Sequence, residues 1–225
     1  MEKIVDYQKN EYHNVRHKEL IDDKELMTAW SYFADMAYFG EVRSGMSILE
    51  FGGGLGNNLI RVSGRAKATM VEPSEIGRNY AAQLGINAIP DLASLNGELF
   101  DFILCRHVLE HVDNPLIVLR ELHAALKANW QLILVVPFEK PDLRPADDDI
   151  DYHLYCWNPQ TLKNLLNRAG FCVDNYWYEY YGAKRKLMPV FKHFGGGAYA
   201  RLVQRVGKIF GYRELVFSAS NIMQR

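Results

Sequence analysis

The chain has 225 residues, of which 48% are hydrophobic and 24% charged, which suits one globular domain with at most an appendage. Its formal net charge of -1 excludes a strong overall field of the kind that attracts nucleic acid. The three cysteines lack C-x-x-C spacing, which argues against a disulfide framework and a zinc site, and the longest apolar run, 132–138, is too short to cross a bilayer. We therefore predict a soluble, cytoplasmic protein.

The first 45 residues are predicted to form one or two helices packed outside a sheet. Apolar residues recur at helical spacing from Leu26 to Ala37, and Gly40 then ends the segment. Four side chains that precede Leu26 are expected either to line a site or to lie on a solvent-exposed helix: Tyr7, Tyr12, His13 and His17.

The next segment is predicted to form a strand, a glycine turn and a helix. The strand is 47–51, and a helix over 57–64 follows the turn. A helix N-terminus at the rim of a sheet presents backbone N–H groups and a positive dipole end to a polar ligand. The motif is E-x-G-x-G-x-G, formed by Glu50, Gly52, Gly54 and Gly56. It does not fit the G-x-G-x-x-G frame that binds dinucleotides.

A second predicted strand, 68–72, ends in a carboxylate. Glu72 follows Gly52 by 20 residues, a separation at which an acid on the next strand reaches a ribose diol. Pro73 stops the strand, and Ser74 is expected to cap a helix through Leu84. The alternative is a surface acid that only stabilises the start of this helix.

The third and fourth predicted strands, 86–89 and 100–105, each lead into polar residues. Asp91 and Leu92 follow the third strand, and the fourth runs into the segment R-H-V-L-E-H-V-D-N-P, residues 106–115. In doubly wound sheets the loops beyond the strand carboxyl ends form the binding crevice, so both loops are expected there. Asn114 and Pro115 begin a helix predicted to reach Lys127.

The remaining chain is predicted to complete the sheet. A strand over 131–137 precedes an acidic loop, which lacks calcium-loop spacing and is better explained as a solvated turn: Asp147, Asp148, Asp149 and Asp151. A helix ends at Ala169, and strands over 171–181 and 214–221 are expected to pair antiparallel. Between them, 182–213 contains eight Lys and Arg residues and no acid, with an amphipathic helical face and a Gly195–Gly197 hinge.

Two motifs carry a resemblance to a known family. E-x-G-x-G-x-G resembles motif I of class I S-adenosylmethionine-dependent methyltransferases, and residues 107–115 resemble the H-x-L-E-H-x-x-x-P signature of the ubiquinone- and menaquinone-type enzymes. The similarity spans 46–171. It implies an α/β, doubly wound, Rossmann-like sheet of seven strands, mostly parallel with an antiparallel last strand and helices on both faces. It also implies a helical lid over 1–45 and a cofactor-binding domain over 46–225, with a basic insertion at 182–213.

The resemblance also implies roles for individual residues. Glu50 would hold the amino-acid end of S-adenosylmethionine, Glu72 its ribose and Asp91 its adenine amino group, with Leu92 against the ring. The implied cofactor-binding set is Glu50, Gly52, Gly54, Gly56, Glu72, Pro73, Asp91, Leu92 and Arg106. The histidines that could take a proton from the acceptor are His107, His111 and His153, any of which could instead bind substrate or only support the loops. No metal site is expected.

We therefore predict methyl transfer from S-adenosylmethionine to a hydroxyl, less readily an amine, of a small or carrier-linked metabolite, with S-adenosylhomocysteine as product. The basic insertion favours an anionic or phosphate-bearing acceptor, or peripheral contact with an acidic membrane. The chain lacks the N/D-P-P-aromatic tetrapeptide of base-amine methyltransferases, which argues against nucleic acid. The alternatives are a nicotinamide-dependent oxidoreductase and a noncatalytic partner subunit that binds the cofactor.

Overall fold

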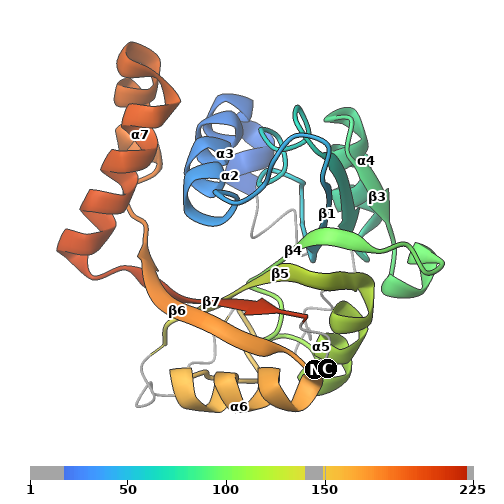
Figure 1. The fold of residues 1–225 in the computed structure, drawn as a ribbon. Helices are drawn as coiled ribbons and strands as arrows, with labels where there is room; N and C mark the ends of the chain where they lie inside the picture. The colour runs from blue at the N-terminus through green and yellow to red at the C-terminus, as the bar shows by residue number, and fades with distance from the viewer. Residues whose placement is uncertain (1–17, 140–148, 150, 222–225) are drawn as a thin grey trace, which may run out of the picture.

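The structure is a computed structural model that describes residues 18–139, 149 and 151–221. A seven-stranded sheet in the order β3-β2-β1-β4-β5-β7-β6 forms its centre (Figure 1). The strands are β1 Ser47–Phe51, β2 Lys67–Val71, β3 Asn87–Ile89, β4 Phe100–Arg106, β5 Leu126–Pro137, β6 Cys172–Tyr180 and β7 Arg213–Ser220. Strands β1 to β5 pair in parallel, and β7 runs antiparallel to both of its neighbours. The predicted fold class and its antiparallel last strand are confirmed.

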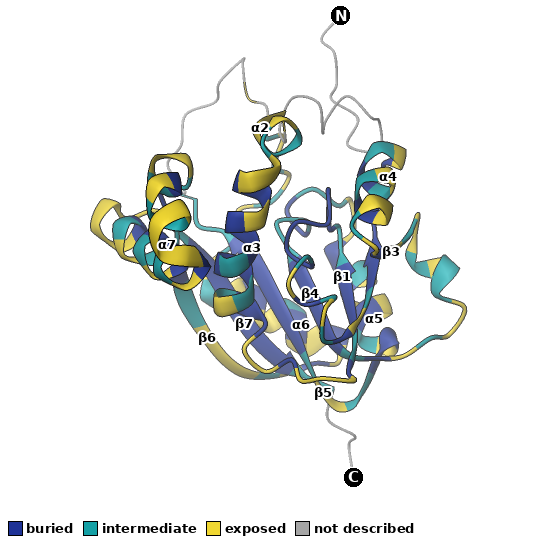
Figure 2. Ribbon diagram, turned by 90° about the horizontal axis from the view of Figure 1, so that it is seen from above, coloured by how far each residue is buried: buried dark blue, intermediate teal, exposed yellow. Residues whose placement is uncertain are grey.

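Helices cover both faces of this sheet, as predicted (Figures 1 and 2). One face carries α5 Pro115–Ala125 and α6 Pro159–Ala169, over a core that includes Leu122, Leu162 and Phe217. The other carries α2 Lys18–Asp22, α3 Lys24–Tyr38, α4 Glu75–Gln83 and α7 Met188–Phe210. Trp30 and Phe33 of α3 lie in this second core, so α3 packs as part of the main domain. The described residues also include two short 3₁₀ helices, Leu92–Leu95 and Arg185–Leu187.

Side chains at the helix starts explain where the helices begin. The carboxylate of Asp23 accepts from the N–H of Leu26, and Ser74 caps α4 as predicted. Asn158 forms a reciprocal capping box with Thr161 at the start of α6, and Gly170 ends that helix in the left-handed conformation. These side chains fix where α3, α4 and α6 begin and where α6 ends.

The predicted helix over 57–64 is wrong. The segment forms successive turns, with i→i+4 backbone bonds only from Ser63 to Leu59 and from Ala66 to Val62. Gly52, Gly54 and Gly56 all have positive φ, and the side chains of the two following asparagines turn inward and are buried. Glycine conformations and local side-chain hydrogen bonds compete with the helical ladder here, so no regular helix forms.

A smaller correction concerns the helix predicted to reach Lys127. Helix α5 ends at Ala125, and β5 begins at Leu126, five residues before its predicted start. Leu126 pairs with Phe100, and a register shift follows before the regular ladder with β4 resumes. The apolar end of the helix therefore continues directly into the sheet.

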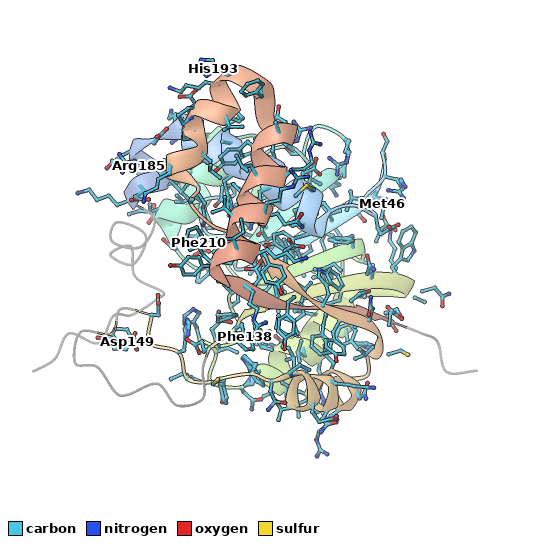
Figure 3. The ribbon with its side chains drawn as sticks, turned by 90° about the vertical axis from the view of Figure 1, so that its left-hand side faces the viewer. Met46, Phe138, Asp149, Arg185, His193 and Phe210 are labelled. Atoms are coloured by element: carbon cyan, nitrogen blue, oxygen red, sulfur yellow. The ribbon has the colours of Figure 1, made fainter. Side chains whose placement is uncertain are left out.

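The basic segment after β6 forms a bent helix against α3. Gly195 interrupts α7 with φ 77° and ψ 176°, and Figure 3 shows two helical segments meeting at a bend near His193. A Cβ added at Gly196 would lie 2.1 Å from the Tyr32 ring, so the contact with α3 requires glycine. The predicted amphipathic helix is present, and the predicted hinge coincides with the bend. Within the described residues, no helix is both long and apolar enough to cross a membrane.

Candidate active site

A cavity of about 1460 Å³ opens at the carboxyl ends of β1, β2 and β4. It lies where the strand order reverses between β1 and β4, the place at which open α/β sheets bind ligands. The loops that follow strands β1 to β5 reach its wall, together with α3 and the segment before α6. Its lining includes 52–54, 71–73, 90–93, 106–108 and 110–113.

The glycine turn rests on a buried carboxylate. Glu50 is 1% exposed, and its Oε1 accepts from Asn58 Nδ2 at 2.6 Å. Asn58 Oδ1 in turn accepts from the indole N–H of Trp30 at 3.3 Å. The other oxygen of Glu50, Oε2, is buried and has no hydrogen-bond partner in the described chain. Burial raises the pKa of Glu50 to about 7, although the hydrogen bond from Asn58 acts to lower it.

Close packing also explains two glycines of the turn. A Cβ at Gly52 would lie 2.3 Å from Val108 Cγ2, and one at Gly56 would lie 3.0 Å from Ile86 Cδ1. Both residues have positive φ. Gly52 therefore lets the turn approach the loop after β4 closely, and Gly56 lets it approach the segment between α4 and β3.

Glu72 ties the glycine turn to the end of β2. Its Oε2 accepts from Gly54 N and its Oε1 from Ser74 N, both at 2.9 Å. Arg78 donates to the carbonyl oxygens of Glu72 and Pro73, at 2.9 Å and 2.6 Å. The Glu72 carboxylate also lines the cavity, where a ligand hydroxyl could donate to it.

Asp91 and Leu92 also line the cavity, but Asp91 is engaged locally. Its Oδ1 accepts from both Ser94 N at 2.9 Å and Ser94 Oγ at 2.7 Å, which caps the short 3₁₀ helix. The predicted contact with adenine stays a prediction for this residue.

A buried charged network surrounds the end of β4. Glu214, on β7, is fully buried and accepts from Arg106 Nη2 at 2.9 Å, from the Tyr38 hydroxyl and from His107 Nε2 at 2.8 Å. Burial alone would raise the pKa of Glu214, but the charge of Arg106 and the hydrogen bonds from His107 and Tyr38 outweigh it and lower the pKa to about 2. The carboxylate therefore stays ionised and fixes the groups around it.

His107 holds an unusual position in this network. It has φ 53°, and its ring is partly exposed to the cavity. Burial, together with the charge of Arg106, lowers the pKa of His107 to about 4, so the ring is neutral near pH 7. Because ionised Glu214 only accepts hydrogen bonds, Nε2 carries the proton and Nδ1 keeps its lone pair.

The other two predicted histidines lie together. The rings of His111 and His153 pack edge to face with centroids 4.8 Å apart, and Glu139 Oε1 lies 2.6 Å from His153 Nδ1. Beneath them Glu110 is fully buried, and neither of its carboxylate oxygens has a hydrogen-bond partner within the described ranges. Burial raises the pKa of Glu110 to about 8.

The structure thus brings most predicted site residues to one cavity. The lining includes Gly52, Gly54, Glu72, Pro73, Asp91, Leu92, Arg106 and the three histidines. Glu50 and Gly56 do not line it, and Glu50 is buried beneath the turn. Arg106, predicted to bind the cofactor, is bound to Glu214 and Tyr38 as well as reaching the wall. Tyr7, Tyr12, His13, His17, Asp147 and Asp148 lie outside the described residues.

Sequence reasoning missed several residues of the site. The sequence predicts a helix start at Asn57 and Asn58, a covering helix around Tyr38 and a strand at Glu214, and assigns none of these residues to the site. The only sequence indication for Glu214 is that a charged residue stands at the start of an apolar strand. No local motif accompanies it. Lys184, from the basic segment, also lines the cavity, with its Nζ 3.7 Å from the Trp30 ring centroid.

Comparison with known proteins places this fold and motif set in a family. The methyltransferase domain family matches residues 24–176, more than half of the chain. The chain belongs to this methyltransferase family. The prediction of a class I S-adenosylmethionine-dependent methyltransferase, with that cofactor, is thereby confirmed, and the match does not single out the ubiquinone-type subgroup.

Solved structures agree with this family at the level of the fold. A chain from the complex of the Haloferax volcanii Trm112 methyltransferase activator superposes with TM-score 0.64 at 15% identity, covering 94% of this chain and 96% of that one. A SAM-dependent methyltransferase from Thermotoga maritima gives 0.62 at 18%, covering 94% and 98%.

A third similar structure was solved with ligands. Phosphoethanolamine N-methyltransferase 2 of Haemonchus contortus, in complex with phosphomonomethylethanolamine and S-adenosylhomocysteine, gives TM-score 0.60 at 12% identity. The match covers 99% of this chain but 62% of that one, so this chain spans less than two thirds of its length. Among curated protein sequences, none matches this chain.

Proposed function

We propose that this methyltransferase transfers the methyl group of S-adenosylmethionine to a hydroxyl of a small or carrier-linked metabolite, with His107 as general base. The cofactor supplies an electrophilic methyl on a sulfonium leaving group, so catalysis depends on in-line placement and on removal of the acceptor proton. The observation that carries the proposal is the hydrogen bond between His107 and buried, ionised Glu214 at the cavity wall.

The residues around the glycine turn fit the cofactor. The buried Oε2 of Glu50 lies beneath Gly53 and lacks a partner within the described chain, so it is suited to a cationic amino group that reaches the turn. The carboxylate of Glu72, held by Gly54 and Ser74, is suited to the ribose hydroxyls. Asp91 and Leu92 are proposed to face the adenine.

His107 is proposed as the base because its neutral state and its tautomer are both set by neighbours. Glu214 accepts from Nε2, which leaves the lone pair of Nδ1 to take the hydroxyl proton. Glu214 then stabilises the imidazolium that forms, as the buried carboxylate does in a carboxylate–histidine pair. An amine acceptor would need the same proton removal and is the less favoured substrate.

The experiment is radiolabelled methyl transfer to a panel of hydroxyl and amine metabolites in free and phosphorylated forms, followed by kinetics on the acceptor found. His107→Asn is the test variant, because asparagine tolerates positive φ and keeps the backbone. We expect kcat to fall by about 10²–10⁴ while S-adenosylhomocysteine affinity stays within about twofold. His193→Ala, at an exposed position on α7, is the control and should keep wild-type kcat.

Two outcomes would overturn the proposal. Unchanged kcat in His107→Asn would show that His107 is not the general base. Tight S-adenosylhomocysteine binding without methylation of any acceptor would favour the noncatalytic partner subunit.

A further inference from the structure

We propose that Glu110, His111 and His153 bind a divalent first-row transition ion, of which Zn²⁺ is the reference case, in the wall of the same cavity. One ligand atom from each residue lies within 4.8 Å of the other two. The sequence did not predict a metal site at these residues.

The buried carboxylate is the first argument. Glu110 is fully buried, and both of its oxygens lack hydrogen-bond partners in the described chain. His111 Nε2 lies 3.9 Å from Oε1. A carboxylate taken out of water is costly unless a cation or several donors satisfy it. A metal ion at this position would satisfy it.

The arrangement of His153 is the second argument, and it is independent of Glu110. Glu139 Oε1 lies 2.6 Å from His153 Nδ1, so Nδ1–H donates to the carboxylate and Nε2 is the ring nitrogen left for an ion. Histidines that bind metals almost always donate their other ring N–H to such an outer partner. His153 therefore has the outer partner that is typical of a metal ligand.

The backbone holds the two ligand-bearing segments together. Leu154 N donates to Glu110 O at 2.8 Å, which joins the segment before α6 to the loop after β4. With metal–ligand bonds of about 2.0–2.2 Å at tetrahedral angles, two ligand atoms on one ion stand about 3.3–3.6 Å apart. The three ligand atoms lie within 4.8 Å of one another, so binding would require them to approach by up to about 1.5 Å.

The ligand types indicate which ions fit. Two imidazole nitrogens and one carboxylate oxygen suit Zn²⁺, Mn²⁺, Fe²⁺ or Co²⁺, whereas Ca²⁺ and Mg²⁺ prefer oxygen ligands. Three protein ligands leave coordination positions open toward the cavity. There the ion would bind the acceptor oxygen and lower the pKa of its hydroxyl. This role rests on the proposed methyl transfer. Binding of the ion itself does not depend on that proposal.

The test is titration of the chelator-treated full chain with Zn²⁺, followed by calorimetry, and with Co²⁺, followed by its visible absorption. We expect one equivalent to bind. Glu110→Gln and His153→Gln should each weaken binding by more than about 100-fold, and Glu139→Gln by about 10-fold to 100-fold, because an outer partner is worth that much. His193→Ala should bind like the wild type.

Several results would overturn the metal site. It fails if Zn²⁺ does not bind stoichiometrically, or if Glu110→Gln and His153→Gln bind as tightly as His193→Ala. Circular dichroism and S-adenosylhomocysteine binding, measured on each variant, identify any that fail to fold. Because S-adenosylhomocysteine binding is measured without metal, a failed metal site and a failed methyltransferase proposal give different results.

Discussion

Glu50 is a buried residue that is expected to affect both the stability of the protein and its binding of a ligand. It lies beneath the glycine turn, held by Asn58 on one oxygen and without a partner in the described chain on the other. Burial raises the pKa of Glu50 to about 7, so its ionised form is costly in the free protein. A cationic ligand group would remove that cost, and the protein would be more stable with the ligand than without it.

Glu50→Gln tests this account through pH. Because the folded pKa of Glu50 lies above its unfolded value, its favourable contribution is present below about pH 4.5 and is lost as pH rises through 7. The variant lacks this titration, so its free energy of unfolding relative to wild type should rise by about 3 kcal/mol between pH 4.5 and pH 8. Urea denaturation at the two pH values measures the change.

The same variant should bind S-adenosylhomocysteine about 10-fold to 100-fold more weakly at pH 8, because a charged hydrogen bond is lost. Glu41→Gln, whose side chain is 72% exposed, is the matched control and should change neither quantity. Equal relative stability of Glu50→Gln at both pH values would contradict the burial argument.

At the scale of elements, α7 packs beside the segment after β6 that lines the cavity. The helix packs on α3 through Gly196 and on the end of β6 through Gly207, where a Cβ would lie 2.4 Å from Tyr181 N. Tyr181 and Lys184 flank this contact and line the cavity. Backbone atoms cannot yield as side chains do, so the position of α7 depends on this glycine.

Gly207→Ala should therefore destabilise the protein by about 1–3 kcal/mol through overpacking. Gly197→Ala is the matched control, because it lies in the same helix with its nearest neighbour, Arg201 Nη1, 3.8 Å from the added Cβ. Alanine favours the helix there, so this variant should gain up to about 1 kcal/mol. Urea denaturation compares the two, and equal effects would show that the contact with Tyr181 is not tight.

At the scale of the whole molecule, the strand order creates the site. The reversal between β1 and β4 separates two loops at the carboxyl ends of the sheet, and β7 inserts between β5 and β6 to bring Glu214 under His107. Residues more than 100 positions apart in the chain thus share one network. The cavity is a property of the sheet and not of one motif.

A ligand specific for this cavity should stabilise the entire fold. S-adenosylhomocysteine at about 100 times its Kd adds about 2.7 kcal/mol, which corresponds to a rise in Tm of about 5–11 °C for a chain of this size. NAD at the same concentration should leave Tm unchanged, since the turn lacks the dinucleotide frame. Differential scanning fluorimetry measures both, and a shift with NAD alone would support the oxidoreductase alternative.

Local patterns predicted the parts of the fold that depend on neighbours in sequence. Ser74 and Gly170 lie at a helix start and end as predicted, and the seven strands fall within a few residues of their expected places. The helix over 57–64 was wrong because buried side-chain bonds of Asn58 and positive-φ glycines replace the helical ladder. Those bonds lead to Glu50 and Trp30, and pattern reasoning does not reveal partners at such distances.

By itself, the sequence determined the fold class, the glycine turn, the spacing from Gly52 to Glu72 and the histidine-rich loop, because each depends on short-range spacing and on backbone preference. The tertiary structure alone decided that Glu214 pairs with His107 and that Glu110, His111 and His153 meet. These groupings depend on strand order and on backbone contacts between distant loops. Burial then sets their pKa values, because removal from water changes the cost of each charge.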